Sequence, residues 1–171
     1  MQQIWGGHGY IRENGMEQYV RDARINMIYE GTNTIQSLDL LGRKVLQDNG
    51  AKLRKFGELV TALIEDEGHR DEMAEFINPL AELAGKVEKL TMEIGMKAMR
   101  NPDEAGAAAV DYLRVVGHLV LSYFWARMAS IALQKPSDDR FYASKLATAR
   151  FYFAKLQPET AMLIRSARAG S

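Results

Sequence analysis

The chain has 171 residues, with 22 basic and 22 acidic side chains and no cysteine. This balance gives no overall field that would attract nucleic acid or an anionic membrane, and the lack of cysteine excludes disulfides and thiolate metal sites. A reducing, cytoplasmic environment is the simplest expectation, and the start of the chain carries no signal-peptide pattern. No segment is expected to span a bilayer, because Arg114, His118 and Arg127 interrupt the most apolar stretch, residues 110–133.

The first elements are predicted to be a glycine-rich loop and a short helix. Three glycines favour a loop over residues 5–15. A chain that opens on such a loop, with no element before it, suggests a piece of a longer protein. Asn14, with Glu17 as its capping partner, predicts a helix from about residue 15 to residue 22, followed by an irregular connector.

The next helix is predicted over residues 33–47, with Thr32 as its N-cap. Apolar side chains recur on one face of this segment, and the sequence Asp-Asn-Gly at residues 48–50 is typical of a helix end. The apolar positions are Ile35, Leu38, Leu41 and Val45.

The second half of the chain reads as amphipathic helices joined by short breaks. A helix is predicted from Ala51, and a break is predicted at residues 68–70. The pair Asn78-Pro79 favours a new helix start inside a segment that runs to about Met99. The apolar positions of the first of these helices are Leu53, Phe56, Leu59, Val60, Leu63 and Ile64.

A long helix is predicted from Asn101-Pro102 to about Gln134, because a cap, a proline and two acids stand together at its start. Its expected core-facing stripe is Val110, Leu113, Val116, Val120, Phe124, Met128 and Ile131. A break at residues 135–137 precedes a last helix, predicted from Asp138 to about Leu156, which Gln157-Pro158 is expected to kink or restart. The tail from Ser166 is expected to fray.

No segment shows the two-residue alternation of a half-buried strand, so the predicted fold class is all-α, an antiparallel helical bundle. Two parts are predicted. Residues 1–50 carry the motifs, and residues 51–171 form a helical extension.

Glu30 is the strongest candidate for a chemical role. It stands between Tyr29 and Gly31, directly before a predicted helix. An isolated acid at a helix start is most often favoured only by the helix dipole. The motif around Glu30 argues for more.

Several motifs in the first 36 residues together resemble the C-terminal signature of the acyl-CoA dehydrogenase family. The motifs are Gln3-Ile4-Trp5-Gly6-Gly7-His8-Gly9-Tyr10, Glu17, Arg21-Asp22-Ala23-Arg24-Ile25, Ile28-Tyr29-Glu30-Gly31-Thr32 and Ile35-Gln36. The remainder resembles, by arrangement more than by motif, the extra helical domain of a long bacterial subgroup of that family.

The resemblance implies α,β-desaturation of an acyl-CoA thioester, with FAD as the hydride acceptor. In many members the Glu of this motif removes the α-proton, and this position falls on Glu30. Such a base needs a raised pKa, which an apolar pocket favours. Tyr29 and Gly31 would then contact substrate. The subgroup includes enzymes for short acyl thioesters and for a methylthiopropanoyl thioester.

The resemblance also assigns FAD contacts to Gln3, Gly6 and Gly7, and to Thr32 and Thr34. Amides freed by glycines suit phosphate groups, and helix starts suit anions. It further implies an electron-transferring flavoprotein as electron acceptor and a homodimer or homotetramer.

The histidines and the helices from residue 51 onward allow other interpretations. His118 is expected to be a hydrogen-bonded core residue, and the three histidines are too dispersed for a metal site. The alternative function is a non-catalytic oligomerisation or lid module, which the plain helices from residue 51 onward favour. Binding of DNA, as in some alkylation-response relatives, is not expected because acids cluster in residues 65–75.

Overall fold

The computed structural model describes residues 1–29, 32–136 and 138–171. Every regular element within these ranges is helical, and none of them is a strand, which confirms the all-α prediction. The chain forms two compact units, Met1–Ile35 and Gln36–Ser171. The predicted division at Gly50 stays a prediction.

The first unit is built on one α-helix, α1 (Met16–Ile28), preceded by two short 3₁₀-helices, η1 (Gly6–Tyr10) and η2 (Arg12–Asn14). The predicted Asn14 cap is wrong. The Asn14 side-chain amide donates to the carbonyl oxygen of His8 at 2.7 Å and thereby holds the preceding loop.

Helix α1 continues through the segment for which an irregular connector is predicted. Its exposed face carries local pairs that favour helix. Arg21 forms an ion pair with Glu17 at 2.8 Å, and the Gln18 amide donates to Asp22 at 2.7 Å. Pairs at this spacing stabilise isolated helices by about 0.2–0.5 kcal/mol each. Helix α1 is therefore favoured by pairs within its own sequence.

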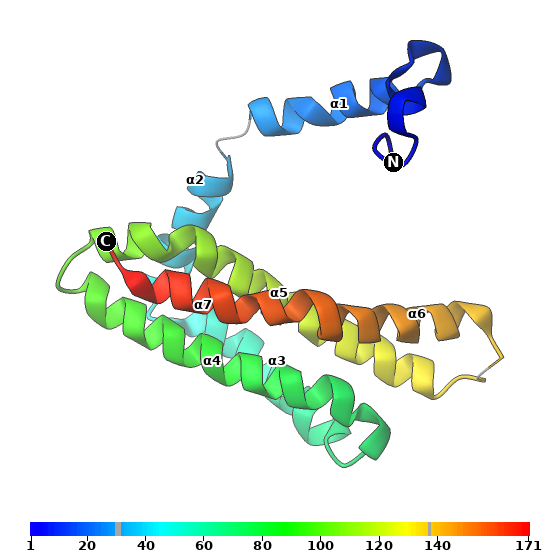
Figure 1. Cartoon of the computed structure of the whole chain (residues 1–171). Coiled ribbons are helices and arrows are strands. Elements are labelled where there is room, and N and C mark those ends of the chain that lie inside the picture. The colour runs from blue at the N-terminus through cyan, green and yellow to red at the C-terminus, as the bar shows by residue number, and fades with distance from the viewer. Residues whose placement is uncertain (30–31, 137) are drawn as a thin grey trace. The chain divides into compact units, whose positions relative to one another are not determined.

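The second unit is a helical bundle whose central member is the longest helix, α5 (Figure 1). Helix α5 packs against α4, α6, α7 and the π-helix η3. The elements in chain order are α2 (Thr32–Leu38), which spans the unit boundary, η3 (Asp39–Leu46), α3 (Ala51–Glu67), η4 (Asp71–Met73), α4 (Ala74–Ala98), α5 (Asp103–Leu133), α6 (Arg140–Phe151), the π-helix η5 (Tyr152–Leu156), η6 (Gln157–Glu159) and α7 (Thr160–Ala169).

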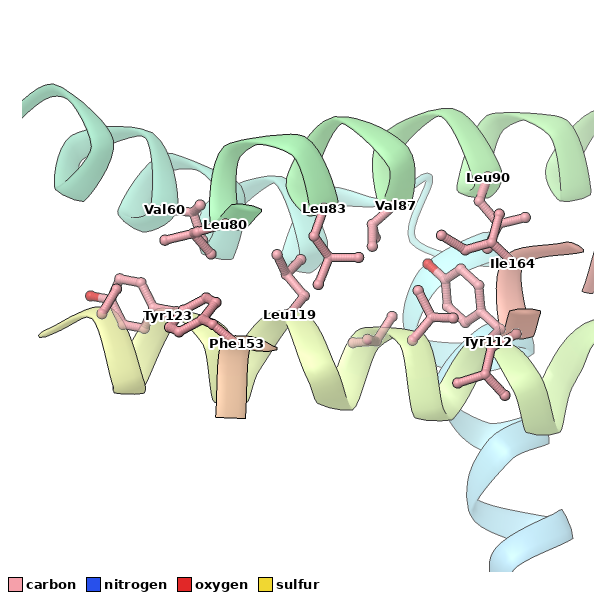
Figure 2. Close-up of a cluster of buried hydrophobic side chains, with 14 of the residues drawn as sticks. Val60, Leu80, Leu83, Val87, Leu90, Tyr112, Leu119, Tyr123, Phe153 and Ile164 are labelled. Atoms are coloured by element: carbon pink, nitrogen blue, oxygen red, sulfur yellow. The ribbon is translucent and has the colours of Figure 1, made fainter. Parts of the chain in front are cut away.

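The core of this unit lies between α4 and α5, and is closed by η5 and α7 (Figure 2). Leu80 and Leu83 of α4 face Leu119 of α5, while Phe153 and Ile164 come from the C-terminal segment. Phe153 meets Phe76 edge to face, with ring centroids 5.6 Å apart. A continuous core of this kind is what drives α-helical bundles to fold.

Several predicted helix ends are confirmed. Asn49 adopts a left-handed conformation, with φ of 53°, in the turn between η3 and α3. The Asn101 side-chain oxygen accepts from the backbone N–H of Asp103 at 3.2 Å, as a cap of α5 should. A cap that was not predicted starts α6, where the Asp139 side chain accepts from the backbone N–H of Phe141 at 2.9 Å.

Pro79 does not start a helix, contrary to the prediction. It is the sixth residue of α4, which runs through it. Proline at this position cannot donate the backbone hydrogen bond to the carbonyl oxygen of Glu75. The helix tolerates this loss because Glu75 lies in its first turn, directly after a 3₁₀ turn. The Gln157 side-chain amide donates to the carbonyl oxygen of Pro79 at 3.0 Å and ties this part of α4 to η6.

The C-terminal tail does not fray as predicted. Helix α7 extends to Ala169, and the hydroxyl and backbone N–H of Ser171 donate to the Glu104 carboxylate at 3.0 and 3.3 Å. Lys97 also donates to the carbonyl oxygen of Arg168 at 2.8 Å. These contacts anchor the last residues to α4 and α5.

The predicted stripe of α5 is only partly correct. Val116 is buried, but Val110, Phe124 and Ile131 are 45%, 48% and 51% exposed. The buried face is a different one and consists of Ala108, Ala109, Tyr112, Val115, Val116, Leu119, Ser122, Tyr123, Ala126, Ala129, Ser130 and Ala132. Apolar side chains lie on both faces of α5, so spacing alone did not identify the face that packs.

Helix α5 contains the most apolar stretch of the sequence, for which no membrane span is predicted. Among the helices of the described ranges it is the one that is long and apolar enough, by length and composition, to cross a bilayer. Within its most apolar window, 44% is buried against the rest of the molecule. The apolar run therefore has a packing role on one face of the helix.

Candidate functional site

The residue on which most of the predicted chemistry depends, Glu30, lies outside the described residues, as does Gly31. The structure describes both neighbours in the chain. Tyr29 ends α1, with its backbone N–H bonded to the carbonyl oxygen of Ile25 at 3.0 Å, and its side chain is 66% exposed. Thr32 begins α2. The described part of the motif thus stands at two consecutive helix termini.

The predicted FAD contacts near the N-terminus lie in a tightly turned segment. Gly6 has a φ of +55°, a conformation that favours glycine, and its N–H donates to the carbonyl oxygen of Gln3 at 3.2 Å. No heavy atom lies within 4 Å of the positions that Cβ atoms would take on Gly6 and Gly7. A flat or anionic group could therefore approach this backbone closely.

Gly9 is the one buried residue among the described positions of the first unit. A side chain there would collide with the backbone of Gln2, whose own amide donates to the carbonyl oxygen of Gly9 at 3.4 Å. The glycine pattern of this segment is therefore explained by two different requirements. Gly9 permits the turn to close, and Gly6 with Gly7 leaves an open backbone surface.

Thr32 and Thr34 lie in the first turn of α2 and are exposed. Gln3, Gly6 and Gly7 precede α1 in the chain, while these threonines follow it. Helix α1 has 13 residues, which corresponds to a length of about 20 Å. The structure thus gives the predicted contacts as two groups, one at each end of α1.

The first unit exposes far more apolar surface than a self-contained domain would. The exposed large side chains of this unit include Ile4, Trp5, Tyr10, Ile11, Tyr19, Val20, Ile25, Met27, Ile28, Tyr29 and Ile35. Exposed apolar patches of this extent mark interaction sites. A small hollow of about 310 Å³ between the N-terminal turn and α1 is lined by Met1, Met16, Tyr19, Val20 and Met27 among others. These exposed residues make the first unit a candidate contact surface.

A larger groove, which sequence reasoning missed, lies wholly within the second unit. It has a volume of about 1200 Å³ and runs between α3 with η3 on one side and α4 with the start of α5 on the other. Small residues form much of its wall, including Gly57 of α3 and Ala84 and Gly85 of α4. Glu58 and Glu88 are among its polar residues.

The sequence did carry a signal for this groove. Glycine in a helix interior costs roughly 0.5–1 kcal/mol relative to alanine, so it needs a reason. Gly57 and Gly85 stand within α3 and α4, and neither has a heavy atom within 4 Å of its Cβ position. The space that side chains would occupy is left open along both helices.

A polar cluster joins α5 to the C-terminal segment around His118. One ring nitrogen of His118 lies 3.0 Å from the hydroxyl of Tyr152, and the other lies 2.9 Å from the carboxylate of Glu159. Arg114 binds the same carboxylate at 2.7 Å. The prediction of a hydrogen-bonded core histidine is confirmed, because the His118 side chain is largely buried.

These contacts shift two of the ionisation equilibria. The hydrogen bond from His118, followed by the charge of Arg114, holds the pKa of Glu159 below its ordinary value. Burial raises the pKa of Tyr152, and the nearby Glu159 carboxylate acts in the same direction. Each group has a structural partner, so the cluster fastens α5 to the joint between η5 and α7.

Comparison with known proteins assigns both parts of the chain to one class, the C-terminal helical domains of acyl-CoA-oxidising enzymes. Residues 1–46 match the family described as acyl-CoA dehydrogenase, C-terminal domain. Residues 56–171 match the family described as acetyl-CoA dehydrogenase C-terminal like. The chain therefore belongs to the acyl-CoA dehydrogenase family.

Individual relatives extend over nearly the whole chain. The 3-methylmercaptopropionyl-CoA dehydrogenase of Ruegeria pomeroyi is 38% identical over 154 residues, 88% of this chain and 26% of that protein. The broad-specificity linear acyl-CoA dehydrogenase of Mycobacterium tuberculosis is 28% identical over 168 residues, 91% of this chain and 28% of its own. A butyryl-CoA dehydrogenase of Syntrophomonas wolfei is 27% identical over 166 residues, 91% and 27% respectively. The chain spans about a quarter of the length of these relatives.

Proposed function

We propose that this chain is the C-terminal part of a flavin-dependent acyl-CoA dehydrogenase that desaturates an acyl-CoA thioester between its α and β carbons. The observation that carries the proposal is the similarity to dehydrogenases along almost the entire chain, including the 38% identical relative. The first unit supports it independently, since its exposed apolar residues require a covering surface that a larger enzyme would supply.

In this proposal Glu30 removes the α-proton of the thioester as a carboxylate base. The α-proton is weakly acidic, so the base must have a raised pKa, and an apolar, water-poor pocket favours the protonated carboxyl group. Tyr29, whose exposed ring stands at the end of α1, would contribute an apolar wall to this pocket. Tyr29 and Gly31 are the proposed substrate contacts.

FAD, when bound, supplies the acceptor for the hydride that leaves the β carbon. The residues present fit such a group at its phosphate or nucleotide part, because Gly6 and Gly7 leave the backbone open to close approach. Gln3 would contribute a side-chain amide next to them, and Thr32 and Thr34 would offer hydroxyl groups at the start of α2.

The acyl group is proposed to be short and linear. Two of the relatives named above act, by their names, on 3-methylmercaptopropionyl-CoA and on butyryl-CoA, and a third on linear acyl-CoA thioesters. An electron-transferring flavoprotein is the proposed acceptor of electrons from the reduced flavin. The full-length enzyme is proposed to be a homodimer or homotetramer and to be cytoplasmic.

The test is the substitution Glu30→Gln in the full-length polypeptide, with Glu13→Gln as a matched control from the same unit. Flavin reduction by a panel of short acyl-CoA thioesters is followed by dye reduction. We expect Glu30→Gln to keep FAD but to slow reduction by about 100- to 10,000-fold, the usual contribution of a general base. Retained reduction in Glu30→Gln would show that the base comes from elsewhere in the polypeptide.

A second measurement tests the assignment of the 171-residue chain as a part of the site. Titration with FAD should give weak binding that does not saturate at stoichiometric concentrations. Tight one-to-one binding by this chain alone would contradict the view that the flavin site needs additional domains.

A further inference from the structure

The network around His118 has one hydrogen-bond contact more than a neutral imidazole ring can satisfy. The Tyr152 hydroxyl lies 3.0 Å from the carbonyl oxygen of His118 and also 3.0 Å from the ring nitrogen Nδ1. A carbonyl oxygen only accepts, so the single hydroxyl proton of Tyr152 is donated to it. The Ser122 hydroxyl, 3.4 Å away, can donate to the same Tyr152 oxygen. That oxygen is therefore an acceptor toward Nδ1, and Nδ1 carries a proton.

The other ring nitrogen of His118 also carries a proton. Nε2 lies 2.9 Å from a carboxylate oxygen of Glu159, and the hydrogen bond from His118 is the largest of the causes that hold the pKa of Glu159 below its ordinary value. Glu159 is therefore a carboxylate near neutral pH and has no proton to donate. Nε2 is the donor. With all of these contacts formed, the His118 ring is protonated on both nitrogens and is a cation.

A neutral His118 ring gives up part of this network. Its one proton stays on Nε2, because the Glu159 carboxylate only accepts. Nδ1 is then an acceptor, and the Tyr152 proton turns from the carbonyl oxygen to Nδ1. Loss of the second ring proton therefore removes one hydrogen bond. It also removes the attraction between a cationic ring and the carboxylate, which is stronger in a largely buried site than in water.

The contacts of His118 fall on the two ends of the irregular segment between α6 and α7. Tyr152 is the first residue of the π-helix η5, and Glu159 is the last residue of the 3₁₀-helix η6. A π turn followed by a 3₁₀ turn interrupts the α-helical hydrogen-bond pattern, and such interruptions often mark hinges. One side chain of α5 thus clamps both ends of this joint, residues 152–159.

The joint has other anchors whose strength does not depend on a proton. Phe153 packs edge to face against an aromatic ring of α4, and the Gln157 amide donates to a backbone carbonyl oxygen of the same helix. These contacts hold the joint on the core whether or not the His118 ring is charged. A change in the charge of the ring therefore acts on the joint locally and leaves the contact between α4 and α5 in place.

The titratable and charged groups that face His118 are few. Glu159 faces it from η6 and Tyr152 faces it from η5. Arg114, one turn earlier on α5, binds the same oxygen of Glu159 at 2.7 Å. Within the described parts of α4, α6 and α7, no ionisable side chain forms a hydrogen bond or ion pair with these residues. Arginine stays charged at all relevant pH values, so Glu159 keeps one partner when the ring is neutral.

We propose that His118 is a pH-sensitive clasp, whose protonated ring holds residues 152–159 tightly against α5 and whose neutral ring lets this joint loosen while the core stays folded. The stabilisation from the ring proton is lost as the pH rises through the titration of His118. At the acid end it is lost as the pH falls through the pKa of Glu159, which lies below its ordinary value of 4.5. The clasp is closed between these two limits. This inference does not depend on Glu30 or on FAD.

The first test is NMR of the ring nitrogens of His118 in the 171-residue chain, from about pH 5 to about pH 8, the range in which histidine side chains change charge. We expect protons on both nitrogens at the acid end and on Nε2 alone at the alkaline end. His8 and His69, which are exposed and lie outside the network, are internal references. A His118 ring that keeps one protonation state throughout, or a neutral ring with its proton on Nδ1, would overturn the proposal.

Hydrogen exchange followed by mass spectrometry tests whether the ring proton closes the joint. After correction for the intrinsic rate at each pH, amides of residues 152–159 should exchange about two- to tenfold faster at about pH 8 than at about pH 5, which corresponds to the net value of one hydrogen bond. Amides of α4 around Leu83 should show no such change. Equal exchange of the joint at both pH values, or a core that opens together with it, would contradict the clasp.

Substitutions separate the His118 proton from other effects of pH. In His118→Gln, which cannot gain a proton in this range, the pH dependence of exchange in the joint should disappear. Tyr152→Phe keeps the aromatic ring without the hydroxyl and should reduce the dependence. The matched control is His69→Gln, at an exposed histidine, which should keep it in full. Retained dependence in His118→Gln, or equal loss in His69→Gln, would refute the assignment. Where circular dichroism shows that His118→Gln has lost helix content, undiminished dependence in Tyr152→Phe is the refuting outcome.

Discussion

The buried hydrogen bond between Tyr112 and Thr91 offers a test of the core with an unusual sign. Tyr112 is fully buried, and its hydroxyl lies 2.7 Å from the hydroxyl of Thr91. Thr91 in turn donates to the carbonyl oxygen of Val87 at 2.7 Å. Tyr112 must therefore be the donor to Thr91. Burial raises the pKa of Tyr112, so the hydroxyl stays protonated near neutral pH.

The two single substitutions should differ in cost because they leave different groups behind. Tyr112→Phe removes the donor and leaves Thr91 bonded to Val87, so it should destabilise the chain by about 0.5–1.5 kcal/mol, the net value of one hydrogen bond. Thr91→Val removes the acceptor and leaves a buried hydroxyl without a partner. Its cost should be larger, about 1–3 kcal/mol.

In the Thr91→Val background, Tyr112→Phe should therefore be stabilising, because it removes the orphaned hydroxyl. Urea unfolding followed by circular dichroism gives the free energy of unfolding of all four proteins of the cycle. Equal destabilisation by Tyr112→Phe in both backgrounds would refute the reasoning, since it would mean that the Tyr112 hydroxyl reaches water through the groove that Thr91 lines.

Three further predictions concern the second unit. Leu80→Ala, at a fully buried position, should lower the free energy of unfolding in urea by about 2–5 kcal/mol. Met96→Ala, at a position that is 62% exposed, should lower it by less than about 0.5 kcal/mol. Similar losses in the two variants would contradict a buried position for Leu80 in the core. Asn101→Ala should lose about 0.5–2 kcal/mol through the cap on α5, with Asn101→Asp as the conservative control. Hydrogen bonds from Ser171, and then the charge of Lys97, hold the pKa of Glu104 below its ordinary value of 4.5. The stabilisation by ionised Glu104 is present above about pH 4.5 and is lost as the pH falls through the pKa of Glu104 in the folded chain. Glu104→Gln should therefore lower the melting temperature at neutral pH and match wild type in acid. An equal difference in melting temperature at both pH values would exclude this dependence on the ionisation of Glu104.

The helices could be predicted from local sequence patterns, and these patterns were reliable for helix ends at which the chain turns. The turn at Asn49 and the cap at Asn101 were recognisable because each requires a particular residue type at a particular position. Pro79 misled for the opposite reason. Its effect depends on how far it stands from the helix start, and that start is set by η4 and by the contact with Gln157 from a distant part of the chain.

Which face of α5 is buried could not be predicted because the helix is apolar on both. Spacing selects residues that share a face, and it finds the apolar stripe from Val110 to Ile131 more readily than the buried face, where alanines and serines take many positions. Small residues on the buried face permit close packing of α4, α6 and α7 around α5. The predicted stripe is nonetheless a regular apolar face of α5, which the second unit leaves partly exposed.

Glu30 and Gly31, at the centre of the predicted site, lie outside the described residues. Sequence motifs report the residues that a reaction needs, whereas geometry reports where they are held. For Gln3, Gly6 and Gly7 the geometry adds an open backbone before α1. The hollow beside α1 is lined by residues of the N-terminal turn and of α1, and the threonines of α2 are not part of its lining.

The two units therefore differ in what stabilises them, and this difference predicts how substitutions will act. The second unit buries a core of its own, so changes such as Leu80→Ala act on its global stability. The first unit buries only Gly9 among its described residues, so its conformation depends on the surface that covers it. Substitution of exposed apolar residues such as Tyr19 or Met27 should leave the melting temperature of the 171-residue chain nearly unchanged. In a full-length dehydrogenase the same substitutions should impair folding or flavin retention, and a large effect on the 171-residue chain would show that the first unit is already covered within it.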